Sequence, residues 1–325
     1  MRVKDSVVVI TGAGSGIGRE CARLFAGSGA RLVLAGRRLE PLEDVAEACR
    51  LTGARAVAVA ADTSDPLAVK AVADAAVAEF GRIDVWVNNA AVASYARFLQ
   101  LPLADFRRVL DVNIMGYVLG CRAALAQMEK QGSGVIVNVA SIVGEVPQPY
   151  TAPYSMSKAA VRALGVSLRS EVKLHGPAGV SVCTVLPPTI DTPFFDHAAN
   201  YTGRRVLALP PVYPARIVAK RVLRLVRRPQ PETVPGVLGR AMVLQHRLTP
   251  RAVESFMALQ VEYTNLSRTE TASASAGNLF EPAPASVTSR VSGDWHGRAR
   301  HAARVGATAA AGAAAVAFLR RRRAH

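Results

Sequence analysis

Near its start the chain reads VVVITGAGSGIG (residues 7–18), an apolar run that leads directly into a glycine-rich turn. The run predicts a buried strand, and the apolar spacing after the turn predicts a helix to about residue 28. Glycines let a backbone turn sharply and approach a phosphate, and the following helix offers free N–H groups and the positive end of its dipole. The stretch therefore predicts a phosphate-binding turn, with a merely flexible glycine turn as the alternative.

Strand and helix patterns alternate through the next 200 residues or so. Apolar runs predict strands at 31–35, 55–60, 85–87, 135–140 and 180–186, with helices such as 66–80 and 102–131 between them. Alternation of this kind predicts a Rossmann-type doubly wound α/β fold, a parallel sheet of about seven strands with helices on both faces. A last strand is expected at 232–237, where Pro235 favours an edge position. Helical patterns cover 215–228 and the stretch to about residue 266.

Composition narrows the class of protein. A chain of 325 residues with 50% hydrophobic residues can bury a large core. Most of the net charge of +16 lies after Pro214, where no nucleic-acid readout motif or base-stacking aromatics accompany the arginines, so we expect no nucleic-acid partner. Four cysteines without a Cys-x-x-Cys pair and six histidines without a metal-ligand spacing predict reduced thiols and no metal site. The absence of a secretory signal pattern favours a cytoplasmic location.

The second predicted strand ends in Gly36-Arg37-Arg38, about 20 residues after the glycine turn. Dinucleotide enzymes read the ribose 2′ position there: an acid binds the free hydroxyls of NAD, whereas arginine pairs with the 2′-phosphate of NADP. No acid stands at this point, so Arg37 and Arg38 favour NADP(H) over NAD(H). The alternative is that both arginines are solvated at the start of the next helix.

Polar residues follow the third and fourth predicted strands, at the edge where open α/β sheets bind their ligands. Asp62 and Thr63 follow the third strand, and Asn89 and Ala90 follow the fourth. Both pairs are candidates for cofactor binding. Asp62 could instead cap the helix ahead of Pro66, and the two roles are compatible.

Tyr154 and Lys158 lie four residues apart in a helical pattern, on one face of the helix. A free tyrosine loses its proton near pH ~10, and a neighbouring cation favours the phenolate. The pair predicts an acid/base catalyst, although the spacing alone also arises by chance. Ser141 follows the fifth predicted strand. Asn113 interrupts the apolar pattern of the helix at 102–131 and without context would be a bystander.

Together these features resemble the short, single-domain branch of the short-chain dehydrogenase/reductase family. The matching motifs are Thr-Gly-x-x-x-Gly-x-Gly at 11–18, Asp62, Asn88-Asn89-Ala90, Ser141 with Tyr154 and Lys158, and the segment 187–192. The resemblance covers roughly residues 3–245. It implies an oxidoreductase that interconverts a ketone or aldehyde and an alcohol by hydride transfer with a nicotinamide cofactor. It also implies a small-molecule substrate and a homo-oligomer.

The resemblance assigns roles to particular residues. It makes Asn113, Ser141, Tyr154 and Lys158 the catalytic group. Tyr154 would transfer the proton, Ser141 would hydrogen-bond the same substrate oxygen, and Lys158 would lower the tyrosine pKa and hold the nicotinamide ribose. Asn113 would anchor a water that links Lys158 to solvent. The implied cofactor-binding residues are Thr11, Gly12, Ser15, Gly16, Ile17, Gly18, Arg37, Arg38, Asp62, Thr63, Asn89, Ala90, Tyr154, Lys158, Pro187 and Thr192.

We expect a catalytic domain at 1–248 with a substrate lid at about 189–214, a helical extension at 249–267, and a linker and tail at 268–325. Five apolar residues predict an apolar pocket and a lipophilic substrate, namely Tyr95, Phe98, Val146, Phe194 and Phe195. The alternative is that these side chains only pack the lid. Pro188 replaces the glycine usual in relatives, and it removes a backbone donor near the nicotinamide.

The Ala-rich run at 305–319 would form a helix of about 22 Å, shorter than a bilayer core of about 30 Å. Arg298, Arg304 and the arginines at 320–323 flank this run. Membrane contact and a soluble Ala-rich segment are equally supported. A non-catalytic dinucleotide sensor and a membrane-tethered scaffold are the competing functions. The retained Tyr154 and Lys158 favour an enzyme.

Overall fold

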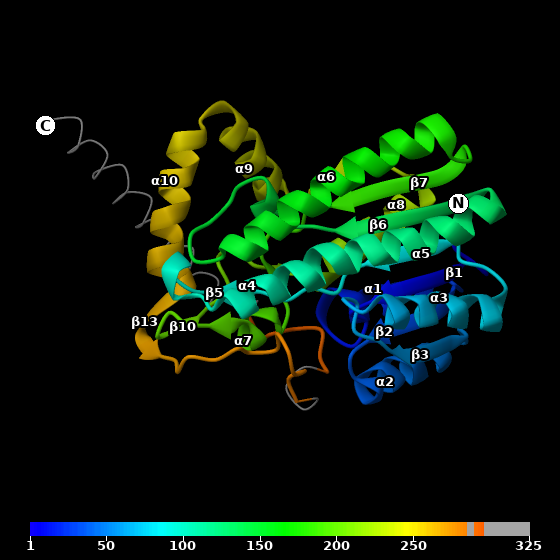
Figure 1. The fold of residues 1–325 in the computed structure, drawn as a ribbon, viewed down its shortest axis with the longest axis horizontal. Coiled ribbons are helices and arrows are strands. Elements are labelled where there is room, and N and C mark those ends of the chain that lie inside the picture. The colour runs from blue at the N-terminus through cyan, green and yellow to red at the C-terminus, as the bar shows by residue number, and fades with distance from the viewer. Residues whose placement is uncertain (285–288, 296–325) are drawn as a thin grey trace, which may run out of the picture.

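A parallel sheet of seven strands forms the centre of the computed structural model, which describes residues 1–284 and 289–295 (Figure 1). Its strand order is β12-β7-β6-β4-β1-β2-β3, and every pairing in it is parallel. The strands are β1 (Val7–Thr11), β2 (Arg31–Gly36), β3 (Ala56–Ala60), β4 (Val85–Asn88), β6 (Ser133–Val139), β7 (Gly179–Val185) and β12 (Glu232–Thr233). The predicted doubly wound fold is confirmed, and β12 lies at the edge as Pro235 suggested.

Helices cover both faces of the sheet (Figure 1). One face carries α1 (Gly16–Ala26), α2 (Leu39–Arg50) and α8 (Ala215–Arg227), and the other carries α3 (Pro66–Phe80), α5 (Gly116–Gln131) and α6 (Ala152–His175). Successive side chains of a strand point to opposite faces. In β1, Val8 and Ile10 accordingly join the first core, and Val7 and Val9 join the second. This double burial explains the continuous apolar runs of the strands.

The helical stretch from Leu103 to Gln131 is unbroken but not uniform. It consists of α4 (Leu103–Leu110), a π-helical turn η2 (Asp111–Met115) and α5. Among the described residues, this stretch is long and apolar enough to cross a membrane. It packs on the sheet instead, with Cys121 and Met128 in the core. Single π turns often lie at functional sites, and this one carries Asn113.

Short elements build the lid and its surroundings. They are β5 (Ser94–Tyr95), η1 (Phe98–Gln100), η3 (Ile142–Gly144), β8 (Ile190–Asp191), α7 (Phe194–His197), β9 (Ala199–Asn200), β10 (Arg204–Val206) and β11 (Tyr213–Pro214). Beyond β12 follow α9 (Val237–Leu248), α10 (Pro250–Gln260), the π turn η4 (Val261–Asn265) and β13 (Leu266–Thr271). β13 pairs antiparallel with β10, so the C-terminal extension is joined to the lid.

The expectation of a linker from residue 268 is wrong for the part that the structure describes. β13 continues to Thr271, and the chain then packs back onto the domain, with Leu279 fully buried and Trp295 5% exposed. The Ser- and Ala-rich composition concealed these two apolar anchors. We call residues 278–284 and 289–295 the strap. The Ala-rich run at 305–319 and the arginines at 320–323 lie outside the described residues.

Candidate functional site

The glycine turn between β1 and α1 depends on glycine at particular positions. Gly12 and Gly16 have φ angles of 66° and 50°, which favour glycine. A Cβ atom on Gly18 would lie 2.2 Å from the carbonyl oxygen of Gly12. The turn is therefore closed tightly on itself, and it exposes the backbone of Ser15 and Ile17 to a neighbouring cavity.

Thr11 and Asn89 fasten this turn to the loop after β4. The Thr11 hydroxyl accepts hydrogen bonds from the backbone N–H groups of Asn89 (3.0 Å) and Ala90 (3.2 Å). The Asn89 amide donates to the carbonyl oxygens of Thr11 (2.9 Å) and Gly12 (3.2 Å). Thr11 thus shapes the edge of the sheet without lining the cavity.

One cavity of about 340 Å³ runs along the carboxyl ends of the strands. The predicted site residues that line it are Gly12, Ser15, Gly16, Ile17, Arg37, Arg38, Asp62, Thr63, Asn89, Ala90, Ser141, Tyr154, Lys158, Pro187 and Thr192. Thr11, Gly18 and Asn113 lie behind this wall. The N-terminus of α1 opens onto the cavity at Gly16 and Ile17, so the turn fits a bound pyrophosphate.

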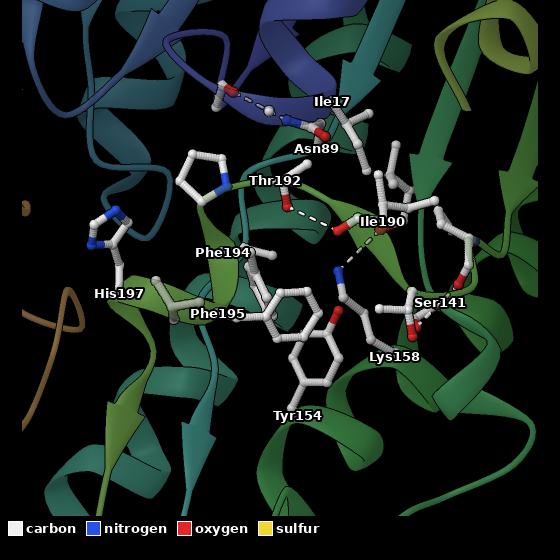
Figure 2. Close-up of a pocket in the computed structure, with 18 of the residues that line it drawn as sticks. Ile17, Asn89, Ser141, Tyr154, Lys158, Ile190, Thr192, Phe194, Phe195 and His197 are labelled. Carbon is white, nitrogen blue, oxygen red and sulfur yellow. Dashed lines mark hydrogen bonds between the residues drawn. The ribbon is translucent and has the colours of Figure 1, made fainter. Parts of the chain in front are cut away.

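Tyr154 and Lys158 project from α6 at the inner end of the cavity, and Ser141 stands beside them at the end of β6 (Figure 2). Burial raises the pKa of Tyr154 to about 12, although a hydrogen bond with Ser141 acts to lower it. Burial also lowers the pKa of Lys158 to about 7. The structure does not show the expected lowering of the tyrosine pKa by Lys158, and burial is the largest cause of the shift.

Tyr117 on α5 holds the ammonium of Lys158, a contact that the sequence analysis missed. Its hydroxyl donates to the carbonyl oxygen of Val139 (2.7 Å). Lys158 Nζ in turn donates to the Tyr117 hydroxyl (3.1 Å) and to the same carbonyl (3.0 Å). Burial holds the pKa of Tyr117 well above its ordinary value, so this phenol stays protonated. No motif signalled it, because only the crossing of α5 over β6 brings the two side chains together.

Asn113 braces the site from the π turn. Its side chain accepts from Val92 N (2.9 Å) and donates to Val92 O (2.9 Å) and to the Ser157 hydroxyl (3.0 Å). These bonds tie the turn to the loop after β4 and to α6, between Tyr154 and Lys158. Both amide protons of Asn113 are used in this way, and the water link to Lys158 stays a prediction.

At the outer end of the cavity, Arg37 and Asp62 have partners far along the chain. Arg37 Nη1 donates to the carbonyl oxygens of Leu279 (3.2 Å) and Phe280 (3.0 Å), and Nη2 donates to that of Asn278 (2.6 Å). Asp62 forms an ion pair with Arg108 of α4. The sequence analysis found neither Arg108 nor the strap.

Asp62 does not cap the following helix. Its carboxylate accepts from the backbone N–H (2.9 Å) and the hydroxyl (2.7 Å) of Ser64. Burial acts to raise the pKa of Asp62, but the hydrogen bonds from Arg108 and Ser64 outweigh it and lower the pKa below its usual range. Asp65 is the N-cap of α3 and accepts from Leu67 N (2.8 Å), so the capping alternative for Asp62 is wrong.

Aromatic lid residues wall the inner end (Figure 2). The ring of Phe194 lies 5.5 Å from that of Tyr154, and Phe195 packs edge-on against Phe194 at 5.6 Å. Tyr95 and Val146 also line the cavity. Phe98 does not: it is 68% exposed and contacts Phe106, so its predicted place in the pocket is wrong.

Comparison with known proteins shows which family the chain belongs to. A family model described as short chain dehydrogenase matches residues 6–201. The chain belongs to the short-chain dehydrogenase/reductase family. It is therefore an oxidoreductase that acts on CH–OH donors with NAD(P), as the resemblance implied.

Two relatives illustrate the similarity in sequence. An uncharacterized oxidoreductase, YxnA of Bacillus subtilis, is 34% identical over 258 residues, which are 79% of this chain and 72% of the relative. Cis-4-hydroxycyclohexanecarboxylate dehydrogenase of Sinomonas cyclohexanicum is 39% identical over 227 residues, which are 70% of this chain and 85% of the relative.

Solved structures agree on the fold. A short-chain dehydrogenase/reductase from Burkholderia phymatum, in complex with NAD, superposes with a TM-score of 0.70 at 26% identity, covering 78% of this chain and 97% of that one. An alcohol dehydrogenase from Thermococcus sibiricus, complexed with 5-hydroxy-NADP, gives a TM-score of 0.62 at 26% identity, covering 71% and 96%. Solved relatives thus bind either form of the cofactor.

Proposed function

We propose that the protein transfers a hydride between NADP(H) and a lipophilic ketone, aldehyde or alcohol, with Tyr154 as the acid/base group. The observation that carries the proposal is one continuous cavity. Its outer part is lined by the glycine turn and Arg37, and its inner part by Ser141, Tyr154 and Lys158. Such a cavity brings a dinucleotide and a substrate oxygen to the same tyrosine.

The cofactor supplies the hydride, and the side chains supply position and protons. Tyr154 Oη gives a proton to the carbonyl oxygen in reduction, and Ser141 Oγ donates a hydrogen bond to that oxygen. A phenol with a pKa of about 12 is protonated at neutral pH, so Tyr154 is ready to donate. Oxidation of the alcohol needs the phenolate and gains as the pH rises.

Two features support NADP(H) over NAD(H). Arg37 and Arg38 follow β2 and line the cavity, and no acid stands at the end of that strand. Arginine pairs with a phosphate through two parallel N–H groups. The proposed roles of Thr63, Ala90, Pro187 and Thr192 in holding the cofactor are supported by their place in the cavity wall.

The wall beyond Tyr154 supports an apolar substrate. Phe194, Phe195, Leu209 and Met257 line it, and few charged side chains reach it. The relative from Sinomonas is named for a hydroxycyclohexane carboxylate. Cyclohexanones and the corresponding secondary alcohols are therefore the first compounds to test.

A homo-oligomer is also part of the proposal. Leu103, Met115 and Val166 are exposed apolar residues on α4, the π turn and α6. Burial between two copies would remove them from water. We further propose a cytoplasmic protein that contacts a membrane through the Ala-rich run at 305–319 and the arginines that flank it.

The test is a titration with NADPH and NADH, followed by turnover of a panel of cyclic and aliphatic ketones. Tyr154→Phe removes only the hydroxyl, so it should lower kcat by at least about 10³-fold while cofactor affinity stays within about twofold. Binding without turnover, unchanged by the substitution, would instead support a dinucleotide sensor. Tighter binding of NADH than of NADPH would overturn the role given to Arg37.

A further inference from the structure

The strap is fastened at the outer end of the cavity by packing and by hydrogen bonds. Leu279 is fully buried in a small cluster with Val92, Val109, Val112 and Ala199. The backbone N–H of Asn278 donates to His197 O (2.9 Å), and that of Leu279 donates to Ala276 O (3.2 Å). Arg108 Nε donates to Leu279 O (2.9 Å). Residues 278–280 therefore have a fixed course beside Arg37.

The second part of the strap joins the glycine turn to the lid. Arg290 O accepts from the backbone N–H of Gly16 (3.0 Å). The Asp191 carboxylate accepts from the Ser292 hydroxyl (2.6 Å) and from the N–H groups of Gly293 (3.0 Å) and Trp295 (2.8 Å). Both described parts thus lie along the cofactor cleft, and Asn278, Pro282 and Ala283 form part of its wall.

The partners of Arg37 conflict with the proposed role of Arg37. Its two terminal nitrogens donate to three carbonyl oxygens of the strap. A 2′-phosphate binds arginine through the same kind of N–H donors. Burial lowers the pKa of Arg37, whereas the negative charges of Asp62 and Glu281 act to raise it. Carbonyl oxygens and carboxylates already surround this guanidinium, and a phosphate would have to approach among them.

We propose that residues 278–280 compete with the 2′-phosphate of NADP(H) for Arg37, so that the strap sets the preference between NADP(H) and NAD(H). The inference rests on the proposed function. NAD(H) has hydroxyls at the ribose and leaves the three carbonyl contacts in place. NADP(H) must draw the guanidinium away from Asn278, Leu279 and Phe280. Docking of the strap thereby weakens NADP(H) selectively, and loosening it strengthens NADP(H).

Two nucleotide fragments isolate the phosphate. 2′,5′-ADP and 5′-AMP differ only at the 2′ position, and neither carries the nicotinamide. In the full chain, Leu279→Ala removes the apolar anchor of residues 278–280 and leaves their carbonyl groups. We expect it to tighten 2′,5′-ADP by roughly fivefold and to change 5′-AMP by less than about twofold, measured by calorimetric titration. In the double variant with Arg37→Met the gain should disappear.

Leu266→Ala is the matched control. Leu266 is 1% exposed and belongs to the same C-terminal extension, but it packs with Tyr95 and Val206, away from Arg37. It should leave the ratio of the two affinities unchanged. A loss of affinity for both fragments in Leu279→Ala would make the strap a simple wall of the site and overturn the inference. An unchanged ratio would overturn it as well.

A measurement on the unaltered protein covers the case in which Leu279→Ala does not fold. The amides of Asn278 and Leu279 are hydrogen-bonded, so they exchange slowly with deuterated water while the strap is docked. Saturating 2′,5′-ADP should speed their exchange, and saturating 5′-AMP should not. Equal protection with both fragments would contradict the competition. Binding of neither fragment would overturn the cofactor assignment itself, which separates the two failures.

Discussion

At its inner end the cavity carries Tyr154 and Lys158 of α6 beside Val139 at the end of β6, two elements of the folded core. At its outer end Arg37 meets Leu279, which lies 242 residues further along the chain. The inner groups Lys158 and Tyr117 are held by buried partners in central elements. The outer group Arg37 is held by the strap, which we propose that a 2′-phosphate displaces. Chemistry is thus assigned to the rigid end and cofactor selection to the adjustable end.

Tyr117→Phe tests whether the inner end of the cavity serves catalysis alone, and we expect the largest effect from this variant. Lys158 loses one acceptor, so its ammonium is less well placed, and kcat should fall roughly tenfold with NADPH affinity within about twofold. The pKa of Lys158, which burial lowers to about 7, should move further down because the charged amine has lost a partner, and the pH profile of kcat checks this shift. Tyr201→Phe also removes a hydrogen-bonded hydroxyl, one that binds Asp105, and should leave kcat unchanged. A fall in affinity rather than in kcat would contradict the rigid inner end.

Lys158→Met tests whether burial of this catalytic amine lowers the stability of the protein. Burial lowers the pKa of Lys158 from 10.5 to about 7, so the unfolded chain holds more protons between these values. The buried Lys158 therefore lowers the stability of the folded protein most below pH 7, and this loss of stability fades as the pH rises toward 10.5. Methionine has no ionisable amine to bury. The Lys158→Met variant should therefore be more stable than the original protein by a few kcal/mol at pH 6.

Urea unfolding at pH 6 and at pH 9.5 checks this prediction. The advantage of the Lys158→Met variant should shrink at the higher pH, because the original protein regains stability there. Val139 O keeps its hydrogen bond from Tyr117 in the variant, so no buried carbonyl is left unpaired. An equal advantage at both pH values would show that charge is not its cause.

Arg108→Met gives the smallest expected effect and concerns the outer end. Asp62 keeps its bonds to Ser64, and Arg37 still holds the strap, so cofactor affinity should change by less than about threefold and kcat should not change. Steady-state kinetics with varied cofactor measure both quantities. Arg55→Met, which breaks an exposed pair with Glu79 away from the cavity, is the control. A drop in kcat beyond threefold would break the division between the two ends.

The sequence predicted what depends on local spacing. The glycine turn, the strand ends and the helix with Tyr154 and Lys158 are each determined by neighbouring residues, and the structure brings them to one cavity. It did not predict Tyr117 or Arg108, whose partners come from other elements. The strap was missed for the same reason, since its contacts with Arg37 span more than 240 residues. Burial raises the pKa of Tyr154, and burial depends on the whole fold rather than on the spacing of Tyr154 and Lys158.

The long separation between Arg37 and the strap also orders events during synthesis. A ribosome adds about 5–20 residues per second, so Arg37 and Asp62 emerge roughly 10–50 s before Leu279. When the chain has been made as far as Gln260, the sheet and the helix with Tyr154 and Lys158 are complete, and the strap has still to follow. A dinucleotide that arrives then meets Arg37 before the backbone carbonyls that compete for it exist. The competition that we propose for Arg37 therefore begins only once residues 278–280 have been made and have docked.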